Sequence, residues 1–214
     1  YENKNVIRTQ GTLPQTFIDC TDGGTIDVNA TWVGPDNPAS YSQVGSLKGT
    51  INFDSCKEGT ETFDGMIAIA FQGFLDKPTK LTITTPDFVY IDTDADNNLT
   101  MTNLTLTASN ITYYGDRLTG GTIKLNGDMT GMLDGNPAFL DCDNLSLSFT
   151  SGLIGVTVSV SGKLKASCLS DWIDITTQTP LFFPSFAHTI CPTAGQITIV
   201  SGADTVKIII APDS

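Results

Sequence analysis

One seven-residue pattern occurs three times in this chain: Φ-x-Φ-x-Gly-x-Φ, in which Φ is a large apolar residue. The copies span residues 69–75, 123–129 and 158–164. A period of two is typical of a β-strand, because successive side chains point to opposite faces. In each copy the glycine falls on the apolar face, where it lets the strand bend or another backbone approach closely. The pattern therefore predicts a coiled, repetitive antiparallel β protein.

Composition supports this prediction. The 214 residues include 31 Thr but only three Glu, so the chain favours strands and offers little material for helix surfaces. No linker or shift in composition divides the chain, which predicts one antiparallel β domain over 20–214, preceded by an extended N-terminal segment over 1–19. Turn signals separate the expected strands, which are 24–33, 45–55, 63–75, 80–91, 99–107, 109–114, 120–133, 143–150, 153–167, 171–178, 195–201 and 204–211.

A second repeat lies in the middle of the chain. The segment NLTLT at 103–107 is matched by NLSLS at 144–148, and each is followed by a glycine-bearing strand. Leu on one side and Thr or Ser on the other is typical of a half-buried strand. The predicted fold class is all-β: a single antiparallel β-sandwich or a coiled β-barrel built from repeated hairpins, with little or no helix. In contrast, the Phe- and Pro-rich segment 179–192 predicts a crossing loop or aromatic plug, because prolines interrupt central strands.

Net charge limits the classes of partner. The chain carries a formal charge of −12, and 20 of its 23 acidic residues are Asp, which favours loops and turns. Nucleic acid is excluded as a partner, because phosphate neutralisation needs clustered Lys and Arg. Anionic membranes are disfavoured on the same ground. No apolar run approaches the length of a transmembrane helix.

The cysteines and the start of the chain predict export. The sequence begins at Tyr1 without Met or a signal peptide, as expected of a mature, processed product. None of the five cysteines forms a C-x-x-C pair, so they favour disulfides over metal or redox chemistry. The predicted pairs are Cys20–Cys56 and Cys168–Cys191, which leaves Cys142 as a buried small hydrophobe.

One loop is a candidate calcium site. Asp92, Asp94 and Asp96 occupy positions 1, 3 and 5 of a short acidic segment, a spacing that converges oxygens on a hard cation. The bidentate Glu at position 12 is missing, since Asn103 stands there. The alternative is a polar hairpin tip whose Asp side chains bond their own backbone. No other cofactor is expected.

Catalysis finds no support in the sequence. His188 is the only histidine, no G-x-S-x-G elbow or dinucleotide fingerprint occurs, and the scattered Asp residues select no catalytic pair. We therefore expect a protein that is not an enzyme.

Three segments carry a resemblance to a known group of proteins. They are CTDGGTIDVNATW at 20–32, GSLKGTINFDSC at 45–56 and ICPTAGQITIVSGADTVKIII at 190–210. With the Gly-bearing, Thr-rich strands between them, the chain resembles Thr/Gly-rich bacterial surface proteins or lipoproteins over most of residues 17–212. The resemblance implies an exported all-β protein and carries over no catalytic or binding residue.

Two functional hypotheses follow. The first is a structural subunit of an extracellular or cell-surface assembly, such as a filament, in which the N-terminal segment is clamped as an added strand in its own chain or in a neighbour. Its apolar face would be carried by Val6, Ile7, Leu13, Phe17 and Ile18. The alternative is a secreted module that binds a glycan or an apolar ligand through its aromatic residues, with Trp32, Tyr41, Tyr90, Tyr113, Tyr114 and Trp172 as candidates.

Overall fold

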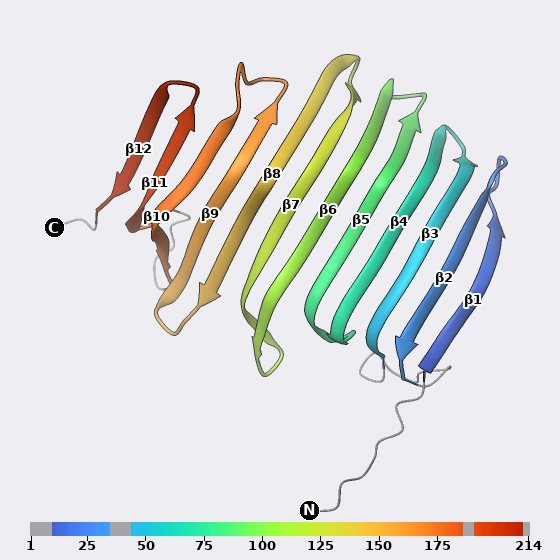
Figure 1. Cartoon of the computed structure of the whole chain (residues 1–214), viewed down its shortest axis with the longest axis horizontal. Helices are drawn as coiled ribbons and strands as arrows, with labels where there is room; N and C mark the ends of the chain where they lie inside the picture. Colours follow the sequence, from blue (N-terminus) through green and yellow to red (C-terminus); the bar gives the residue numbers. More distant parts are fainter. Residues whose placement is uncertain (1–9, 35–43, 186–190, 212–214) are drawn as a thin grey trace, which may run out of the picture.

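The computed structural model describes residues 10–34, 44–185 and 191–211. These residues form twelve strands and no helix (Figure 1). The strands are β1 (Gln10–Asp19), β2 (Thr25–Val33), β3 (Gly45–Glu58), β4 (Glu61–Phe74), β5 (Lys77–Asp92), β6 (Asn97–Tyr114), β7 (Arg117–Leu133), β8 (Asn136–Ser151), β9 (Gly155–Ala166), β10 (Ile173–Pro184), β11 (Ala194–Ser201) and β12 (Asp204–Ile210).

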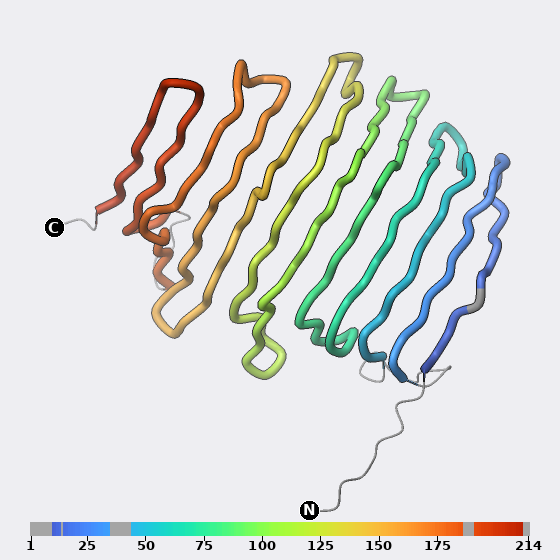
Figure 2. The backbone as a smooth tube through the Cα atoms, viewed as in Figure 1, coloured from blue at the N-terminus to red at the C-terminus, as the bar shows by residue number. Residues whose placement is uncertain are grey.

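All twelve strands belong to one sheet whose spatial order is the order of the chain, β1 to β12. Each strand pairs antiparallel with its sequence neighbours, so the backbone runs up and down without a crossover (Figure 2). The prediction of an all-β fold built from hairpins is confirmed.

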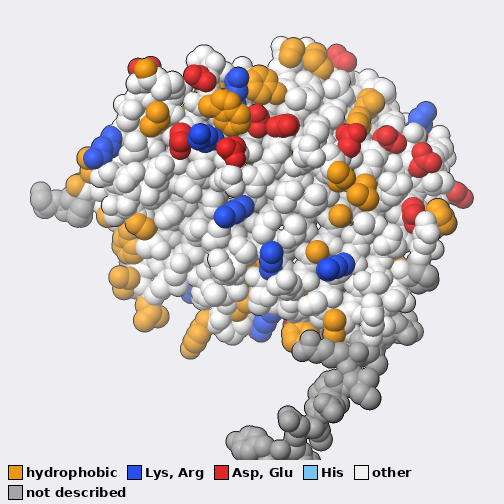
Figure 3. Space-filling model, in the orientation of Figure 1, with side chains coloured by type: hydrophobic (Ala, Val, Ile, Leu, Met, Phe, Trp, Pro, Cys, Tyr) orange, Lys and Arg blue, Asp and Glu red, His pale blue; other side chains and the backbone are white. Residues whose placement is uncertain are grey.

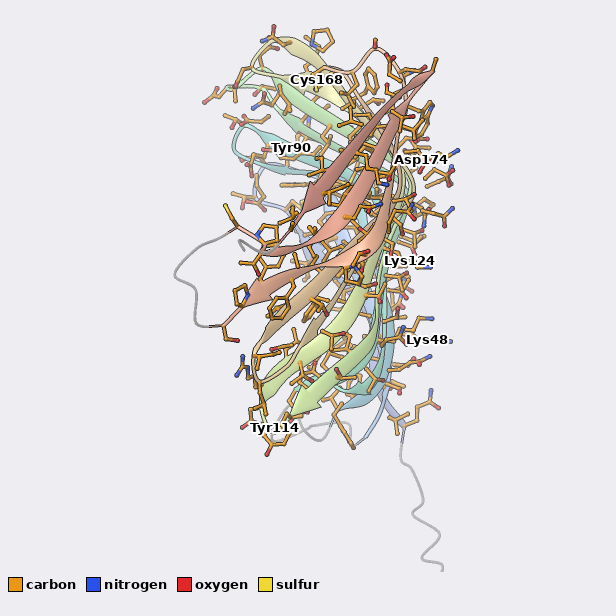
Figure 4. The ribbon with its side chains drawn as sticks, turned by 90° about the vertical axis from the view of Figure 1, so that its left-hand side faces the viewer. Lys48, Tyr90, Tyr114, Lys124, Cys168 and Asp174 are labelled. Atoms are coloured by element: carbon orange, nitrogen blue, oxygen red, sulfur yellow. A yellow bond between two sulfur atoms is a disulfide. The ribbon has the colours of Figure 1, made fainter. Side chains whose placement is uncertain are left out.

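The sheet does not close. β1 and β12 lie at its opposite ends in Figure 1, and among the described residues neither has a second neighbour. Nor does a second sheet cover the first, so the expected sandwich or barrel is replaced by one open sheet. Closure into a barrel needs tilted strands and a fixed stagger around the ring. Here the curvature instead bends each long strand near its middle, which makes a trough (Figure 4).

The two faces of the sheet have different chemistry, which is visible in rows of directly paired residues. Paired residues in neighbouring strands share a face. One apolar row crosses eight strands through Leu13, Ala30, Gly49, Ile69, Ile83, Leu106, Leu125 and Leu145. The adjacent row on the other face crosses all twelve strands through Thr12, Thr31, Lys48, Ala70, Thr82, Thr107, Lys124, Ser146, Ser161, Thr176, Thr198 and Lys207. The apolar face lies inside the trough, and Lys48, Lys124 and Asp174 point outward from it (Figure 4).

The repeated sequence elements produce the bend. Asn103 and Asn144, which open the two repeats, have φ angles of 50° and 53° at irregularities of β6 and β8. Gly127 and Gly162, with φ of 112° and 117°, face these residues so closely that a Cβ would overlap the Asn103 and Asn144 carbonyls. Only glycine combines this φ with this approach. The predicted close backbone approach at these two glycines is confirmed.

Several well-buried residues lie near the same bend, which we call the crease. Phe88 is 7% exposed, Cys142 4% and Cys56 1%. Phe88 packs edge-on against Phe53, with ring centroids 5.6 Å apart, and Phe63 extends this cluster to Tyr90. Burial is not confined to the crease, since Val44 and Phe71 are each 6% exposed nearer the lower ends of the strands.

One strand contradicts the sequence prediction. Residues 179–184 were expected in a crossing loop, but they continue β10, and Leu181–Pro184 pair with β9. The prolines are accommodated because β10 loses register between Thr176 and Leu181 on one side and at two places on the other. Such irregularities are the positions at which a sheet tolerates proline. Residues 186–190 of the expected loop lie outside the described residues.

Candidate interaction surfaces

The two edge strands of the open sheet offer unpaired backbone groups. On β12, Val206, Ile208 and Ile209 are 56%, 45% and 64% exposed. A long, exposed apolar edge is a template for pairing with another strand. β12 was predicted as a strand, but its place at the edge could not be read from the sequence, since edges are defined only once all pairings are known.

The N-terminal segment supplies the other edge. Residues 10–19 form β1, which pairs with β2 of the same chain, so this part is an added strand within its own molecule. Leu13, Phe17 and Ile18 are exposed at 40%, 66% and 50%. Val6 and Ile7 lie outside the described residues.

The edges differ in how well they are protected. β1 contains Pro14, and its register with β2 shifts between Leu13 and Thr16. Proline and bulges are devices that blunt an edge strand. β12 has neither, and its seven residues keep continuous register with β11. Its protection is limited to two charged residues, Asp204 and Lys207. β12 is therefore the more adhesive edge.

The inside of the trough is apolar, and no second layer covers it among the described residues. Contacts between elements join neighbouring strands, as expected for a single sheet.

The outer face is polar and holds one cluster of charges. In Figure 3 most of its middle is white, as expected for Thr and Ser, with scattered Lys. Asp128 and Asp141 are directly paired on β7 and β8, and Asp141, Asp143, Lys163 and Trp172 line a shallow cleft of about 470 Å³. Desolvation and a hydrogen bond with Asp128 raise the pKa of Asp141, so this pair holds a proton more strongly than a lone Asp.

The candidate calcium loop is the turn between β5 and β6. The Asp94 N–H donates to Asp92 Oδ1 at 3.1 Å, and Thr60 Oγ1 donates to the same oxygen at 3.2 Å. Among the described residues, the three carboxylates of Asp92, Asp94 and Asp96 do not converge within 4.8 Å of one another. The turn therefore has the hydrogen bonding of a polar hairpin tip, and calcium binding there stays a prediction.

One of the two predicted disulfides is present. Cys20 and Cys56 are bonded, with sulfur atoms 1.97 Å apart, and link the β1–β2 turn to β3. Cys168 and Cys191 are free and exposed, so the second predicted pair is not formed, because the two residues flank β10 without being brought together. Cys142 is buried, as expected, and burial raises the pKa of its thiol.

Within the described ranges, the one group of three metal-ligating side chains is Cys20, Cys56 and Glu58. The disulfide occupies both sulfur atoms, and the Glu58 carboxylate accepts a hydrogen bond from the Thr21 N–H at 3.0 Å. Hydrogen bonds from the Thr21 side chain and backbone lower the pKa of Glu58. This group is therefore a structural contact at a turn. His188 lies outside the described residues.

The aromatic residues do not form one platform. The Tyr90 hydroxyl donates to Glu61 at 3.0 Å, and the Tyr113 hydroxyl donates to the Pro78 carbonyl at 3.2 Å. Tyr114 is 83% exposed at the β6–β7 turn, on the opposite rim from Tyr90 (Figure 4). Tyr41 lies outside the described residues.

No protein-family model, no curated protein and no solved structure matches this chain. Within the described ranges, the geometry defines a class: an open, single-layer, antiparallel β-sheet protein whose two end strands each have one neighbouring strand. The described part contains no helix long and apolar enough to cross a membrane.

Proposed function

We propose that this protein is a non-enzymatic structural subunit that self-associates through the edges of its sheet in an extracellular or cell-surface assembly. The observation that carries the proposal is the pair of edge strands, each with one partner strand among the described residues, of which β12 keeps continuous register and exposes Val206, Ile208 and Ile209. Backbone pairing at such an edge extends a sheet without any change of fold.

The number of strands supports head-to-tail pairing. Because twelve strands alternate in direction, β1 and β12 run in opposite senses. A second copy in the same orientation would therefore place its β1 antiparallel to β12, which continues the alternation across the junction. A head-to-tail contact that does not close produces an open polymer.

The disulfide supports the proposed location. Disulfides persist in oxidising compartments and are rare in the cytosol. Short Thr and Ser side chains over the outer face also suit a surface exposed to solvent in a long assembly.

The proposal is tested by electron microscopy and analytical ultracentrifugation of the native protein without reductant. Lysine at an edge discourages pairing, so Ile209→Lys on β12 and Phe17→Lys on β1 are the test variants. These side chains are 64% and 66% exposed, and Leu153→Lys, at a turn and 95% exposed, is the matched control.

We expect polymers from the native protein and from Leu153→Lys, and monomers from both edge variants. Monomers at every concentration of the native protein would refute self-association. Dimers abolished by Ile209→Lys alone would replace the polymer with a two-fold contact between β12 strands.

A second candidate function rests on a different observation, the uncovered apolar face inside the trough. A concave surface lined by Leu, Ile and Phe suits an apolar ligand. Binding of a fluorescent fatty acid to native monomers, competed by unlabelled fatty acid, would support this alternative, and absence of saturable binding would remove it.

A further inference from the structure

One rim of the sheet displays large apolar side chains at the tips of three successive hairpins. The turns joining β4 to β5, β6 to β7 and β8 to β9 all lie at the lower margin in Figure 1. We define the apolar rim as Phe74, Leu75, Tyr114, Leu118, Leu153 and Ile154. Their exposed fractions reach 95% for Leu153, 83% for Tyr114 and 68% for Ile154. A single exposed Leu is ordinary, but a group of large apolar side chains along one rim is a candidate contact surface.

The charges at this rim are balanced. Asp76 and Asp116 are matched by Lys77 and Arg117, and the Lys77 Nζ lies 2.7 Å from Asp116 Oδ1. This ion pair raises the pKa of Lys77 and lowers the pKa of Asp116, so both groups stay charged and cancel. The four charged residues beside the apolar tips therefore carry no net charge.

The opposite rim is strongly acidic. Around the turns at the upper margin in Figure 1, the described residues carry Lys57 and Lys165 against many carboxylates. We define the acidic rim as Asp19, Asp22, Glu58, Glu61, Asp92, Asp94, Asp96, Asp134, Asp171 and Asp204. In Figure 3 the Asp and Glu side chains of the visible face gather in the upper half, and hydrophobic groups protrude at the lower margin. The charge of this chain is thus separated along the strand direction.

The shape of the apolar rim indicates what kind of partner it contacts. Hairpins repeat every two strands, so neighbouring tips are about 10 Å apart along the rim. The rim is thus a row of separate projecting side chains. A protein helix or peptide needs a groove, whereas a bilayer surface accepts individual projecting aliphatic and aromatic side chains.

We propose that the apolar rim docks on the surface of a zwitterionic phospholipid bilayer, inserting Tyr114, Leu153 and Ile154 into the interface. Charge separation sets the orientation, because it holds the acidic rim away from the phosphate groups. The net charge of −12 disfavours anionic membranes, and a neutral rim at one end fits a zwitterionic surface. The proposal is independent of edge pairing, since the rim residues lie at turns and not on β1 or β12.

The test is co-sedimentation of the full chain with phosphatidylcholine vesicles. The variant is the double substitution Leu153→Ser with Ile154→Ser, and the control is Leu133→Ser, a 55% exposed Leu at the opposite rim. Circular dichroism and the melting temperature establish that all three proteins are folded. Ile209→Lys is added to the native background so that polymers do not sediment alone.

We expect the native rim to bind vesicles and the double variant to bind about tenfold more weakly or less, from the loss of two inserted side chains. Leu133→Ser should bind within about twofold of the native protein, because its side chain faces away from the membrane. The proposal is overturned if the native protein does not bind, if the double variant binds equally well, or if Leu133→Ser weakens binding to the same extent. Dimerisation through the rim without vesicle binding would also overturn it, in favour of a second copy as the partner.

Discussion

The first five strands and the last five strands of this sheet are bent by similar devices but are held together differently. In the N-terminal part, a disulfide joins Cys20 to Cys56, and the rings of Phe53, Phe63, Phe88 and Tyr90 pack in a chain across β3, β4 and β5. In the C-terminal part, Cys168 and Cys191 are free, and no ring pair of this kind occurs among the described residues. The stability of the C-terminal part depends on strand pairing. This part ends in β12, the less protected of the two edge strands.

The difference indicates which strands of a single-layer sheet unfold most easily. A sheet without a second layer buries few side chains, so local cross-links and clusters decide local stability. We expect the C-terminal strands to open first and the N-terminal strands to remain protected longest.

The largest expected effect comes from removing the disulfide. It closes a loop with a sequence separation of 36, and its loss should cost about 4 kcal/mol of unfolding free energy through the entropy of the unfolded chain. Cys20→Ser with Cys56→Ser would be compared with native protein by urea denaturation. Cys168→Ser with Cys191→Ser is the control, and an equal loss in that control would contradict the free state of those two thiols.

The aromatic cluster should give the next largest effect. Phe88→Ala leaves a cavity at a residue that is 7% exposed, and about 3 kcal/mol of stability should be lost. Leu147, in the C-terminal part, is 40% exposed, so Leu147→Ala should cost about 1 kcal/mol. Thermal denaturation of both variants measures the contrast, and similar losses would show that the two parts are equally packed.

The third largest loss of stability is expected from substituting a glycine at the crease. Gly162→Ala combines a φ of 117° with an overlap between the new Cβ and the Asn144 carbonyl, and about 2 kcal/mol should be lost. Gly59 has a φ of 64° with open space around it, so Gly59→Ala should lose about 1 kcal/mol, the cost of the conformation alone. If both variants lose the same amount, close approach at the crease contributes nothing.

The smallest effect concerns pH. The pKa of Asp141 is raised in the fold by desolvation and by Asp128. Between the usual Asp pKa of 3.8 and the raised value, the folded state binds more protons than the unfolded state. Stability contributed by this group is therefore present at low pH and falls as pH rises through that window.

Asp141→Asn removes this titration and should flatten the stability profile above pH 3.8. Equilibrium urea denaturation at a series of pH values measures it. Asp204→Asn, at an exposed turn, is the control, and an unchanged profile in Asp141→Asn would contradict the coupling.

Much of the fold could be predicted from the sequence, because alternation and turn residues act locally. The Gly127 and Gly162 strands and the Cys20–Cys56 pair follow from period-two patterns and from cysteines that bracket a hairpin. The N-terminal segment 1–19 was predicted to add a strand to its own chain or to a neighbour, and the sequence left that choice open; residues 10–19 add it to their own chain as β1.

The remaining features depend on distant pairings. The segments 99–107 and 109–114 were expected as two strands, but they form the single strand β6 because the positive φ of Asn110 is absorbed as an irregularity. Prolines at 179–184 predicted a loop, and only the register changes of β10 explain their place in the sheet. Whether a sheet closes, and which strands form its edges, is a property of all strands together and leaves no local signal.

The most direct test of edge association is hydrogen exchange, followed by mass spectrometry, on the native, disulfide-intact protein at increasing concentration. The outward-facing amides of an edge strand exchange freely in a monomer and become protected when another strand pairs with them. We predict that protection of residues 204–210 and 10–19 rises with concentration, while protection of the central strands stays constant. Protection of both edges that is independent of concentration, in a protein that remains monomeric, would contradict self-association through the sheet edges.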